Sequence, residues 1–482
     1  MFWTIVSFVA FLGAFAVIGI QSVRVAQRTS TDYLLAGQSV NPWLTALSSM
    51  ATNNSGYAFI GLVGFAYRFG LHTIWLSVAW ILGDLLVWLF VHKRVRIHAE
   101  RVEAKSVPSL LGSTSPSERN PLLIFAAGLL TFVFLGVYAA AQLKAGATAL
   151  HSLFGWEMVV GILLGAVIVV LYCFSGGLRA SIWTDCAQSL VMMVGLAMIL
   201  VLAMTEIGGP IALIENLRQQ DPALALLFPP NLAFGFGLYF LGFVAGGFGA
   251  IGAPHILIRS MALKSPAQFQ KTRRIYLASF VPFVLASAVI GLCTRALMPE
   301  LAEPVTQMTV MGTDMDLALT QQAEQSLPLL AMRLLPSVLV GMVLAAIFAA
   351  TMSTADSQIL SCSAAVTQDM MPRWRSSYLA SKAATLCVTA LATAVAIFAG
   401  HGVFSLVLIA WSALAASLGP ILLLRLAGQP VPTAVGLTMM VVGLMAVVGW
   451  DQSGYQDDVF KLLPGLLLPF SFYLGYRFPN RR

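Results

Sequence analysis

The sequence is divided into long apolar blocks that are separated by short polar connections. The blocks are about 18 to 25 residues long, the length that a helix needs to cross roughly 30 Å of hydrocarbon. An outer-membrane barrel would instead show alternating polar and apolar positions in segments of about ten residues. Only 10% of the 482 residues are charged, whereas the fraction in soluble domains is about 25%. The sequence therefore predicts an all-α membrane protein.

The apolar blocks predict about thirteen membrane-spanning helices in a single transmembrane domain, residues 1–482. They lie at about residues 1–20, 42–66, 72–92, 121–143, 156–174, 181–204, 232–253, 275–294, 327–362, 378–399, 402–424, 431–450 and 458–476. The first block has no small-residue cleavage site and is followed by Arg24 and Arg28. We therefore expect a retained helix and not a signal peptide.

Basic residues cluster in alternate loops, which predicts the orientation of the chain. Lysine and arginine side chains gather in residues 93–105 and 259–274, and Arg259 opens the second group. Acidic side chains prevail in residues 300–324 and 451–458. By the positive-inside rule the N-terminus lies outside and the C-terminus inside. The net charge of +7 then reflects topology, and no nucleic-acid partner is expected.

Two of the blocks are interrupted by glycine and proline. The block 42–66 contains Gly56, and the block 232–253 ends in AGGFGAIGAP, which closes with Pro254. Both residue types disfavour a continuous helix. Interrupted helices at corresponding positions of two halves indicate a transporter with inverted repeats and a binding site at the membrane midplane.

The interrupted blocks are five spans apart, so each begins a set of five spans. The first repeat then covers residues 42–204 and the second covers residues 232–424. Residues 1–20 form an extra N-terminal helix, and residues 431–476 form two C-terminal helices. This division rests on spacing alone, because the two halves share no clear sequence similarity.

The first polar cluster is ATNNSG, residues 51–56, inside the second block. A helix break at Asn53, Asn54, Ser55 and Gly56 would free backbone carbonyls and expose the ends of two half-helices. The carbonyl end of a helix favours a cation, and the amide end favours an anion. The alternative is that the asparagines only hydrogen-bond neighbouring helices.

The second polar cluster is ATMSTADSQ, in the ninth block. Helical spacing places Ala350, Ser353, Thr354 and Ser357 on one stripe, and Asp356 lies within one turn of Ser353. Hydroxyl and carboxylate oxygens are the ligands that hard cations prefer. Hydroxyl groups can also bond to their own helix, but a carboxylate inside a membrane is expensive and indicates function.

Two further carboxylates lie inside blocks. Asp185, near Gln188 and Ser189, is read as an ion or proton ligand or as the partner of a buried cation or hydroxyl. Asp84 has no polar companions in sequence, so a hydrogen bond between helices is at least as good an interpretation. His255 is expected at an interface or helix end. No nucleophile and base stand out, so an enzyme is not expected.

At these residues the chain resembles the sodium:solute symporter family, which includes sodium/proline, sodium/pantothenate and sodium/sialic acid transporters. The segments that carry the resemblance occur in family order and are DYLLAGQSV, SSMATNNSGY, GGLRASIWTDCAQ, GAPHILIRSMAL and GMVLAAIFAATMSTADSQIL, with TQDM beyond. The resemblance implies the LeuT-type fold of inverted five-helix repeats with an extra helix before them.

The resemblance also implies three groups of site residues. The main sodium ligands would be the carbonyls of Ala51, Asn54 and Ala350 and the hydroxyls of Ser353 and Thr354. A second cation would be held by Asp185, Ser353, Asp356 and Ser357. The solute would lie near Asn53, Gly56, Tyr57, Tyr138, Gln142, Gly246, Ala250 and Pro254.

Two departures from the family pattern affect the expected substrate. Proline transporters of this family have an aspartate where this chain has Asn53, so a formal charge is absent here. They also have bulky aromatic residues at the positions of Gly246 and Ala250. The pocket should therefore be wider, or filled by side chains from elsewhere, and proline itself is a doubtful substrate.

The resemblance implies a sodium-coupled symporter that imports a small polar organic solute, an amino acid or an organic acid, across the cytoplasmic membrane of a bacterial cell. Na⁺ would be the coupling ion, with the solute and the lipid bilayer as partners and no obligatory protein partner. One alternative is a proton-coupled transporter or uniporter of the same fold, with Asp185 or Asp356 as the proton site. Another is a transporter-like sensory membrane protein that acts through a separate partner.

Overall fold

The computed structural model describes the chain except residues 303–318, 320–321, 399–402 and 478–482. The described residues fold into helices, and two isolated β-bridges join connecting segments. The structure thus confirms the predicted all-α class. Ten helices in this part of the chain are long and apolar enough to cross a membrane. They are α1 (Phe2–Ser22), α5 (Thr73–Phe90) with α6 (His92–Arg101), α8 (Pro121–Phe154), α9 (Met158–Ile207), α11 (Gly235–Phe248), α13 (Phe269–Leu297), α17 (Ser337–Ala364), α18 (Tyr378–Phe398), α19 (Val403–Leu426) and α20 (Thr433–Asp451).

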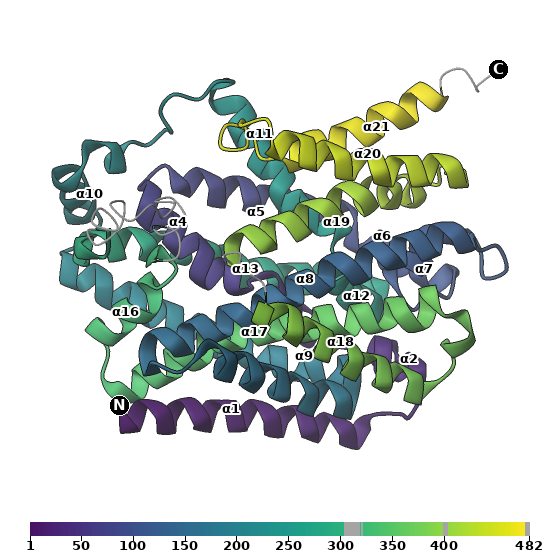
Figure 1. Ribbon diagram of the computed structural model, residues 1–482, viewed down its shortest axis with the longest axis horizontal. Coiled ribbons are helices and arrows are strands. Elements are labelled where there is room, and N and C mark those ends of the chain that lie inside the picture. Colours follow the sequence, from purple (N-terminus) through teal and green to yellow (C-terminus); the bar gives the residue numbers. More distant parts are fainter. Residues whose placement is uncertain (303–318, 320–321, 399–402, 478–482) are drawn as a thin grey trace.

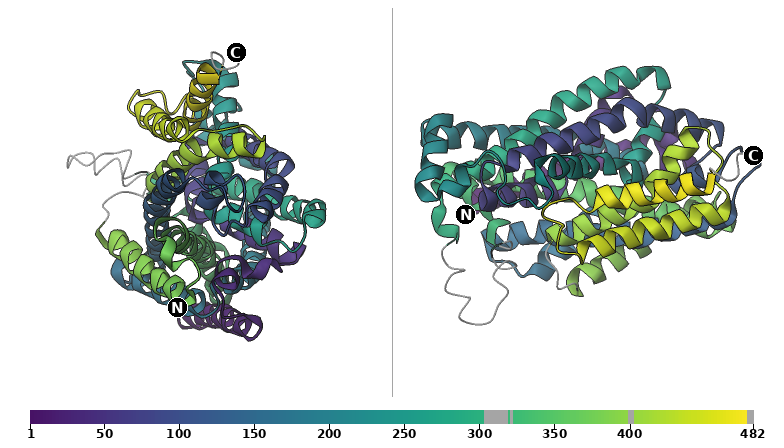
Figure 2. Two further views of the ribbon diagram at one scale, coloured as in Figure 1. Left: turned by 90° about the vertical axis from the view of Figure 1, so that its right-hand side faces the viewer. Right: turned by 90° about the horizontal axis from the view of Figure 1, so that it is seen from above.

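The long helices run roughly side by side as a bundle (Figure 1). Helix α1 lies along one edge of the molecule, and α20 and α21 (Leu462–Arg477) lie along the opposite edge. The end-on view in Figure 2 shows the same arrangement. Helix α17 lies inside the bundle against α1, α8 and α9, and all its residues from Val343 to Ala364 are buried.

The predicted break in the second block is confirmed. Helix α3 (Pro42–Asn53) begins with an Asn41 cap, whose side chain accepts a hydrogen bond from the Leu44 amide, and it ends at Asn53. Asn54 leaves the helical region with φ −92° and ψ 69°. The chain resumes as a π-helical turn, η3 (Tyr57–Gly61), and then as α4 (Leu62–Phe69).

The break in the seventh block is also confirmed. Helix α11 passes into the short 3₁₀ segment η5 (Gly249–Gly252), and Ala253 is extended, with φ −99° and ψ 91°. Helix α12 (Pro254–Ala262) then starts with proline, which needs no amide partner at the first position of a helix.

Helix α12 corrects the predicted place of Arg259. All of its nine residues are buried, which excludes the expected place of Arg259 in a basic loop. That prediction was wrong because the second half of the broken helix lies in the protein interior. His255, expected at an interface or helix end, is the second residue of α12 and is 1% exposed.

Helix α9 folds back on itself at Gly177. This glycine has φ 58° and ψ −142°, and a Cβ there would overlap the Tyr33 carbonyl oxygen. A Cβ built on Gly19 of α1 would meet Tyr172 Cβ at 2.7 Å and Thr184 Cγ2 at 3.0 Å. Since Tyr172 and Thr184 lie on opposite sides of the kink, the two arms of α9 pack together against α1.

The close approach of α5 to α11 gives a first testable prediction. A Cβ built on Gly83 would overlap the Val244 carbonyl oxygen, so Gly83→Ala must separate the two helices. We expect a loss of about 1–3 kcal/mol, the usual range for overpacking, and a lower melting temperature in detergent. Gly136→Ala in α8 is the matched control, because no atom lies within 4 Å of its Cβ position. Equal melting temperatures for the two variants would contradict the close packing.

Candidate functional site

The broken helix α3 is joined to α17 by two buried hydroxyl groups. Ser353 Oγ donates a hydrogen bond to the Ala51 carbonyl at 3.2 Å, and Thr354 Oγ1 donates to the Thr52 carbonyl at 3.0 Å. Both hydroxyls also lie 3.1 Å from the Ala350 carbonyl in their own helix. Three carbonyls and two hydroxyls therefore converge where α3 ends.

Four of the five residues predicted for the main sodium site lie in this group: Ala51, Ala350, Ser353 and Thr354. Asn54 is placed differently, because its side chain turns back and donates to the Met50 carbonyl at 3.1 Å. The carbonyl that faces Thr354 belongs to Thr52, which sequence reasoning missed. The signal that could have found it is the helix end, since the last four carbonyls of a helix lack intrahelical partners.

This oxygen group is suited to an alkali cation. Its members are neutral carbonyl and hydroxyl oxygens, the hard ligands that such cations prefer. The carbonyl end of α3 adds the negative end of a helix dipole. Two of the carbonyls belong to one helix and the hydroxyls to another, so an ion bound here would hold α3 against α17.

Three of the four residues predicted for a second cation, Asp185, Asp356 and Ser357, lie in a cluster with a buried guanidinium, whereas the Ser353 hydroxyl bonds to the Ala51 and Ala350 carbonyls. Arg259 Nη2 lies 2.8 Å from Asp185 Oδ2 and also donates to Ser357 Oγ, while Arg259 Nε donates to Ser48 Oγ at 2.8 Å. Asp356 Oδ1 accepts from Ser357 Oγ at 2.6 Å. Four helices meet here: α3, α9, α12 and α17.

The cluster is fully buried, since Arg259, Asp185 and Asp356 are all 0% exposed. Arg259 is paired with Asp185, while Asp356 Oδ1 accepts from the hydroxyls of Ser181 and Ser357. Asp185 Oδ1 and Asp356 Oδ2 have no partner among the described residues. Sequence reasoning brought Asp185, Asp356 and Ser357 together but missed Arg259, because it was counted with a basic loop. The usable signal was its setting in PHILIRSMAL, a lone charge among apolar residues.

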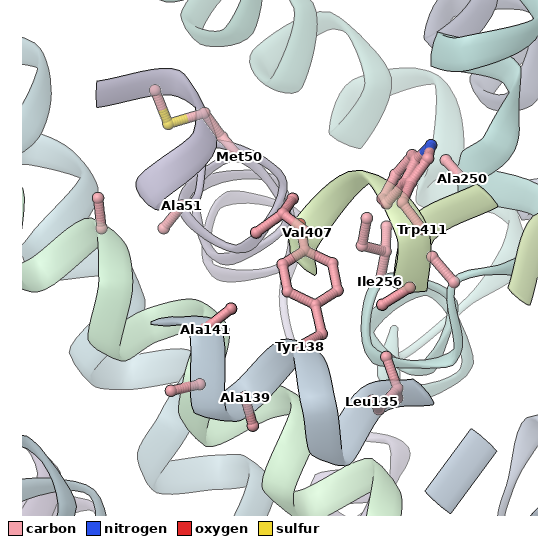
Figure 3. Packing of buried hydrophobic residues seen from close by; sticks show 14 of the residues in the cluster. Met50, Ala51, Leu135, Tyr138, Ala139, Ala141, Ala250, Ile256, Val407 and Trp411 are labelled. Carbon is pink, nitrogen blue, oxygen red and sulfur yellow. The ribbon is translucent and has the colours of Figure 1, made fainter. Parts of the chain in front are cut away.

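Two residues of α8 that were predicted to line the solute site lie at the break in α3. The Gly56 amide donates to Gln142 Oε1 at 2.9 Å, and the Ser55 and Tyr138 hydroxyl oxygens are 3.4 Å apart. Figure 3 shows the Tyr138 ring between the end of α3 and the segment that carries Ala250. The side chain of Tyr57 lies outside the described residues.

Aromatic rings pack against the second broken helix at Gly246. A Cβ on Gly246 would meet Trp80 Cζ3 at 2.7 Å and Phe460 Cδ1 at 3.2 Å. Trp411 Nε1 donates to the Gly246 carbonyl at 2.9 Å. The space beside Gly246 is thus filled by rings from α5, α19 and the segment before α21. This was one of the two expectations for the pocket, and its residues could not be named in advance.

The other predicted solute residues of this helix, Ala250 and Pro254, are buried on η5 and α12. Neither has a polar side chain, so they can contribute only shape and, for Ala250, backbone groups. The Ala250 carbonyl already accepts a hydrogen bond from the Ala253 amide at 3.2 Å. Their place is consistent with a pocket wall and gives no sign of solute recognition.

Asn53 links the end of α3 to two other helices. Its Nδ2 donates to Asp84 Oδ1 of α5 at 3.1 Å and to the Tyr276 hydroxyl of α13 at 2.6 Å. The interpretation of Asp84 as a hydrogen-bonding partner between helices is confirmed. The partner comes from a span that is distant in sequence, in keeping with the lack of polar neighbours of Asp84 along its own helix.

The chain is similar over most of its length to known transporters. A model of the sodium:solute symporter family matches residues 33–443. The high-affinity proline transporter of Bacillus subtilis is 27% identical over 456 residues, which cover 91% of each chain. The sodium/proline symporter of Escherichia coli K12 is 28% identical over 477 residues, which cover 96% of this chain and 90% of the relative.

Two solved structures share the fold. A sodium-coupled sialic acid symporter in a substrate-bound outward-open state matches with a TM-score of 0.77 at 18% identity, covering 98% of this chain and 96% of that one. A nucleobase-cation-symport-1 family transporter in a closed conformation matches with a TM-score of 0.53 at 16% identity, covering 92% and 95%. At these identities the likeness concerns the fold alone.

Proposed function

The chain belongs to the sodium:solute symporter family, and from this premise we propose that it imports a small organic solute, an amino acid or an organic acid, by alternating access. It is a sodium-coupled symporter and not an enzyme. It is a multi-pass integral membrane protein, and its bacterial relatives support the cytoplasmic membrane as its location.

The proposed topology has thirteen spans, with the N-terminus outside and the C-terminus inside. Its support is that α9 folds back at Gly177 and so supplies two spans, while α3–α4 and α21 add two to the ten long helices. The two repeats would then be residues 42–204 and 232–424, each beginning with a broken helix. The distribution of basic loops supports the orientation.

We place the main sodium site at the carbonyls of Ala51, Thr52 and Ala350 and the hydroxyls of Ser353 and Thr354. The observation that carries this proposal is that the hydroxyls of α17 reach the free carbonyls of the broken helix. A sodium ion there would favour the arrangement in which α3 is held against α17. Its release would allow one helix bundle to rock against the other.

The solute would lie between the breaks in α3 and α11–α12. Asn53, Gly56, Tyr138 and Gln142 support this placement, because they bring amide and hydroxyl groups to the end of α3. Half-helix ends at the membrane midplane are the usual solute ligands in transporters built from inverted repeats. Tyr57, Gly246, Ala250 and Pro254 complete the proposed lining.

The coupling is tested by uptake into proteoliposomes. We expect solute accumulation when an inward sodium gradient is imposed and its loss when choline replaces sodium. The solute is first found in a sodium-dependent thermal-shift screen of amino acids, carboxylates and sugars, because a ligand of the folded state raises the melting temperature. Accumulation that is the same in sodium and in choline would falsify the coupling.

A proton-coupled mode is the second candidate. It is favoured by Asp185 and Asp356, two buried carboxylates of which only Asp185 forms an ion pair among the described residues. In this mode a pH gradient would drive accumulation in the absence of sodium. The same vesicles, loaded at one pH and diluted into choline medium at a lower pH, distinguish the two modes.

A further inference from the structure

We propose that the carboxylate of Asp84 binds a cationic nitrogen of the transported solute. The inference rests on the proposed transport function and narrows the solute to compounds with a protonated amine or a quaternary ammonium group. Asp84 is a residue of α5 that was not predicted to line the solute site.

The two oxygens of Asp84 have different surroundings. Oδ1 accepts the hydrogen bond from Asn53 Nδ2 at 3.1 Å, and the same Nδ2 donates to the Tyr276 hydroxyl at 2.6 Å. Oδ2 is buried and has no partner among the described residues. The side chain is 1% exposed, so bulk water does not supply the missing hydrogen bond. Oδ2 is therefore a buried hydrogen-bond acceptor without a donor among the described residues.

The charge of Asp84 is not balanced by the described side chains. Asp185, the other carboxylate near α3, lies 2.8 Å from Arg259 Nη2. Among the ion pairs of the described residues none includes Asp84. An ionised carboxylate in a membrane interior needs a positive partner. For Asp84 this partner must come from outside the described chain, or the group must hold a proton.

Asp84 lies at the junction of the two broken helices. Its partner Asn53 is the last residue of α3. One helical turn before Asp84, Trp80 packs against Gly246 of α11, and its ring centroid is 5.9 Å from that of Trp411. The open oxygen therefore belongs to the region in which the solute is proposed to bind.

The surroundings favour an organic cation over a metal ion. A metal ion needs several oxygen ligands, whereas among the described residues this carboxylate offers one oxygen without a partner, Oδ2. Trp80 and Trp88 lie one helical turn before and one helical turn after Asp84 on α5. The Trp88 ring itself packs on Tyr276 at 4.3 Å and on His92 at 4.2 Å. A charge-assisted hydrogen bond from a cationic nitrogen to Oδ2 fits this setting.

The test uses pairs of compounds that differ in the nitrogen. The purified full chain is melted in sodium with L-proline and cyclopentanecarboxylate, with L-alanine and propionate, and with glycine betaine. We expect a rise in melting temperature only from nitrogen-bearing compounds. In Asp84→Asn the half-maximal concentration should rise roughly tenfold to a hundredfold, as for a lost hydrogen bond to a charged group. The stabilisation by sodium alone should persist.

A charge swap provides the control for a folding defect. Asn53→Asp combined with Asp84→Asn keeps an amide and a carboxylate at the same contact, so it should recover part of the affinity that Asp84→Asn loses. Asn53→Asp alone should perform worse than the swap, since it places two carboxylates side by side. Recovery through the partner position is not expected if Asp84 only supports folding.

Three results would overturn the proposal. The first is an equal shift of the wild type by a compound and its nitrogen-free analogue. The second is an unchanged response of Asp84→Asn to nitrogen-bearing compounds. The third is a wild type whose melting temperature rises with sodium but with none of the nitrogen-bearing compounds. Asp84 would then be a protonated carboxyl group and not a ligand of the solute. A wild type that does not respond to sodium contradicts the proposed function instead, so the two failures are distinguishable.

Discussion

Replacing Arg259 with methionine should remove most of the thermal stability of this protein. Arg259 is 0% exposed and lies between Asp185 and Ser357. Methionine fills much of the same volume and leaves two buried carboxylates without a cation. Breaking one side of a buried ion pair costs about 3–5 kcal/mol. The measurement is the melting temperature and the monodisperse yield after extraction in detergent.

The control for this variant separates burial from charge. Arg218→Met removes an arginine that is 62% exposed and lies 3.9 Å from Glu215, and exposed pairs contribute little. Arg259→Met combined with Asp185→Asn should regain part of the stability, because the second substitution removes the buried carboxylate that lost its partner. If Arg259→Met melts like Arg218→Met, the guanidinium does not hold the four helices together.

Replacing Thr354 with alanine should weaken the response to sodium about tenfold or more, the change produced by losing about 1.4 kcal/mol of binding free energy. Thr354 Oγ1 reaches the Thr52 carbonyl across the junction of α3 and α17. Alanine removes one of the two hydroxyls of the proposed sodium site and leaves that carbonyl without this hydrogen bond. The sodium concentration for half-maximal thermal stabilisation and for half-maximal uptake measures the effect.

Ser363→Ala is the matched control for Thr354→Ala. Ser363 is also a buried hydroxyl residue of α17, and its Oγ donates within the helix to the Ile359 carbonyl at 2.7 Å. Its loss should leave the sodium response unchanged. An unaltered sodium midpoint in Thr354→Ala, or an equal change in both variants, counts against the assigned site.

Several features of the site follow from local sequence. Asn53 to Gly56 interrupt an apolar block, and Pro254 follows a run of glycines, so both helix breaks could be predicted before any contact was known. The stripe of Ala350, Ser353 and Thr354 depends only on helical spacing. These features are decided within one or two turns of chain, where sequence patterns carry most of their information.

The errors at the site arose where neighbours come from distant spans. Asp84 was expected to bond to another helix, but its partner could not be named; it is Asn53, which lies 31 positions away in sequence. Arg259 was counted with basic loops, yet it is buried where α12 meets α3, α9 and α17. Neither contact leaves a periodic signal, because each depends on how separate helices pack.

The sequence by itself determined the class of this protein, its two helix breaks and the hydroxyl stripe of α17, because span length, helix breakers and helical period are properties of neighbouring residues. Only the tertiary structure decided which carbonyl faces Thr354, which cation meets Asp185 and which rings fill the space beside Gly246. Those partners are determined by the packing of helices, and a shift of two residues at a helix end replaces Asn54 by Thr52 at the proposed sodium site.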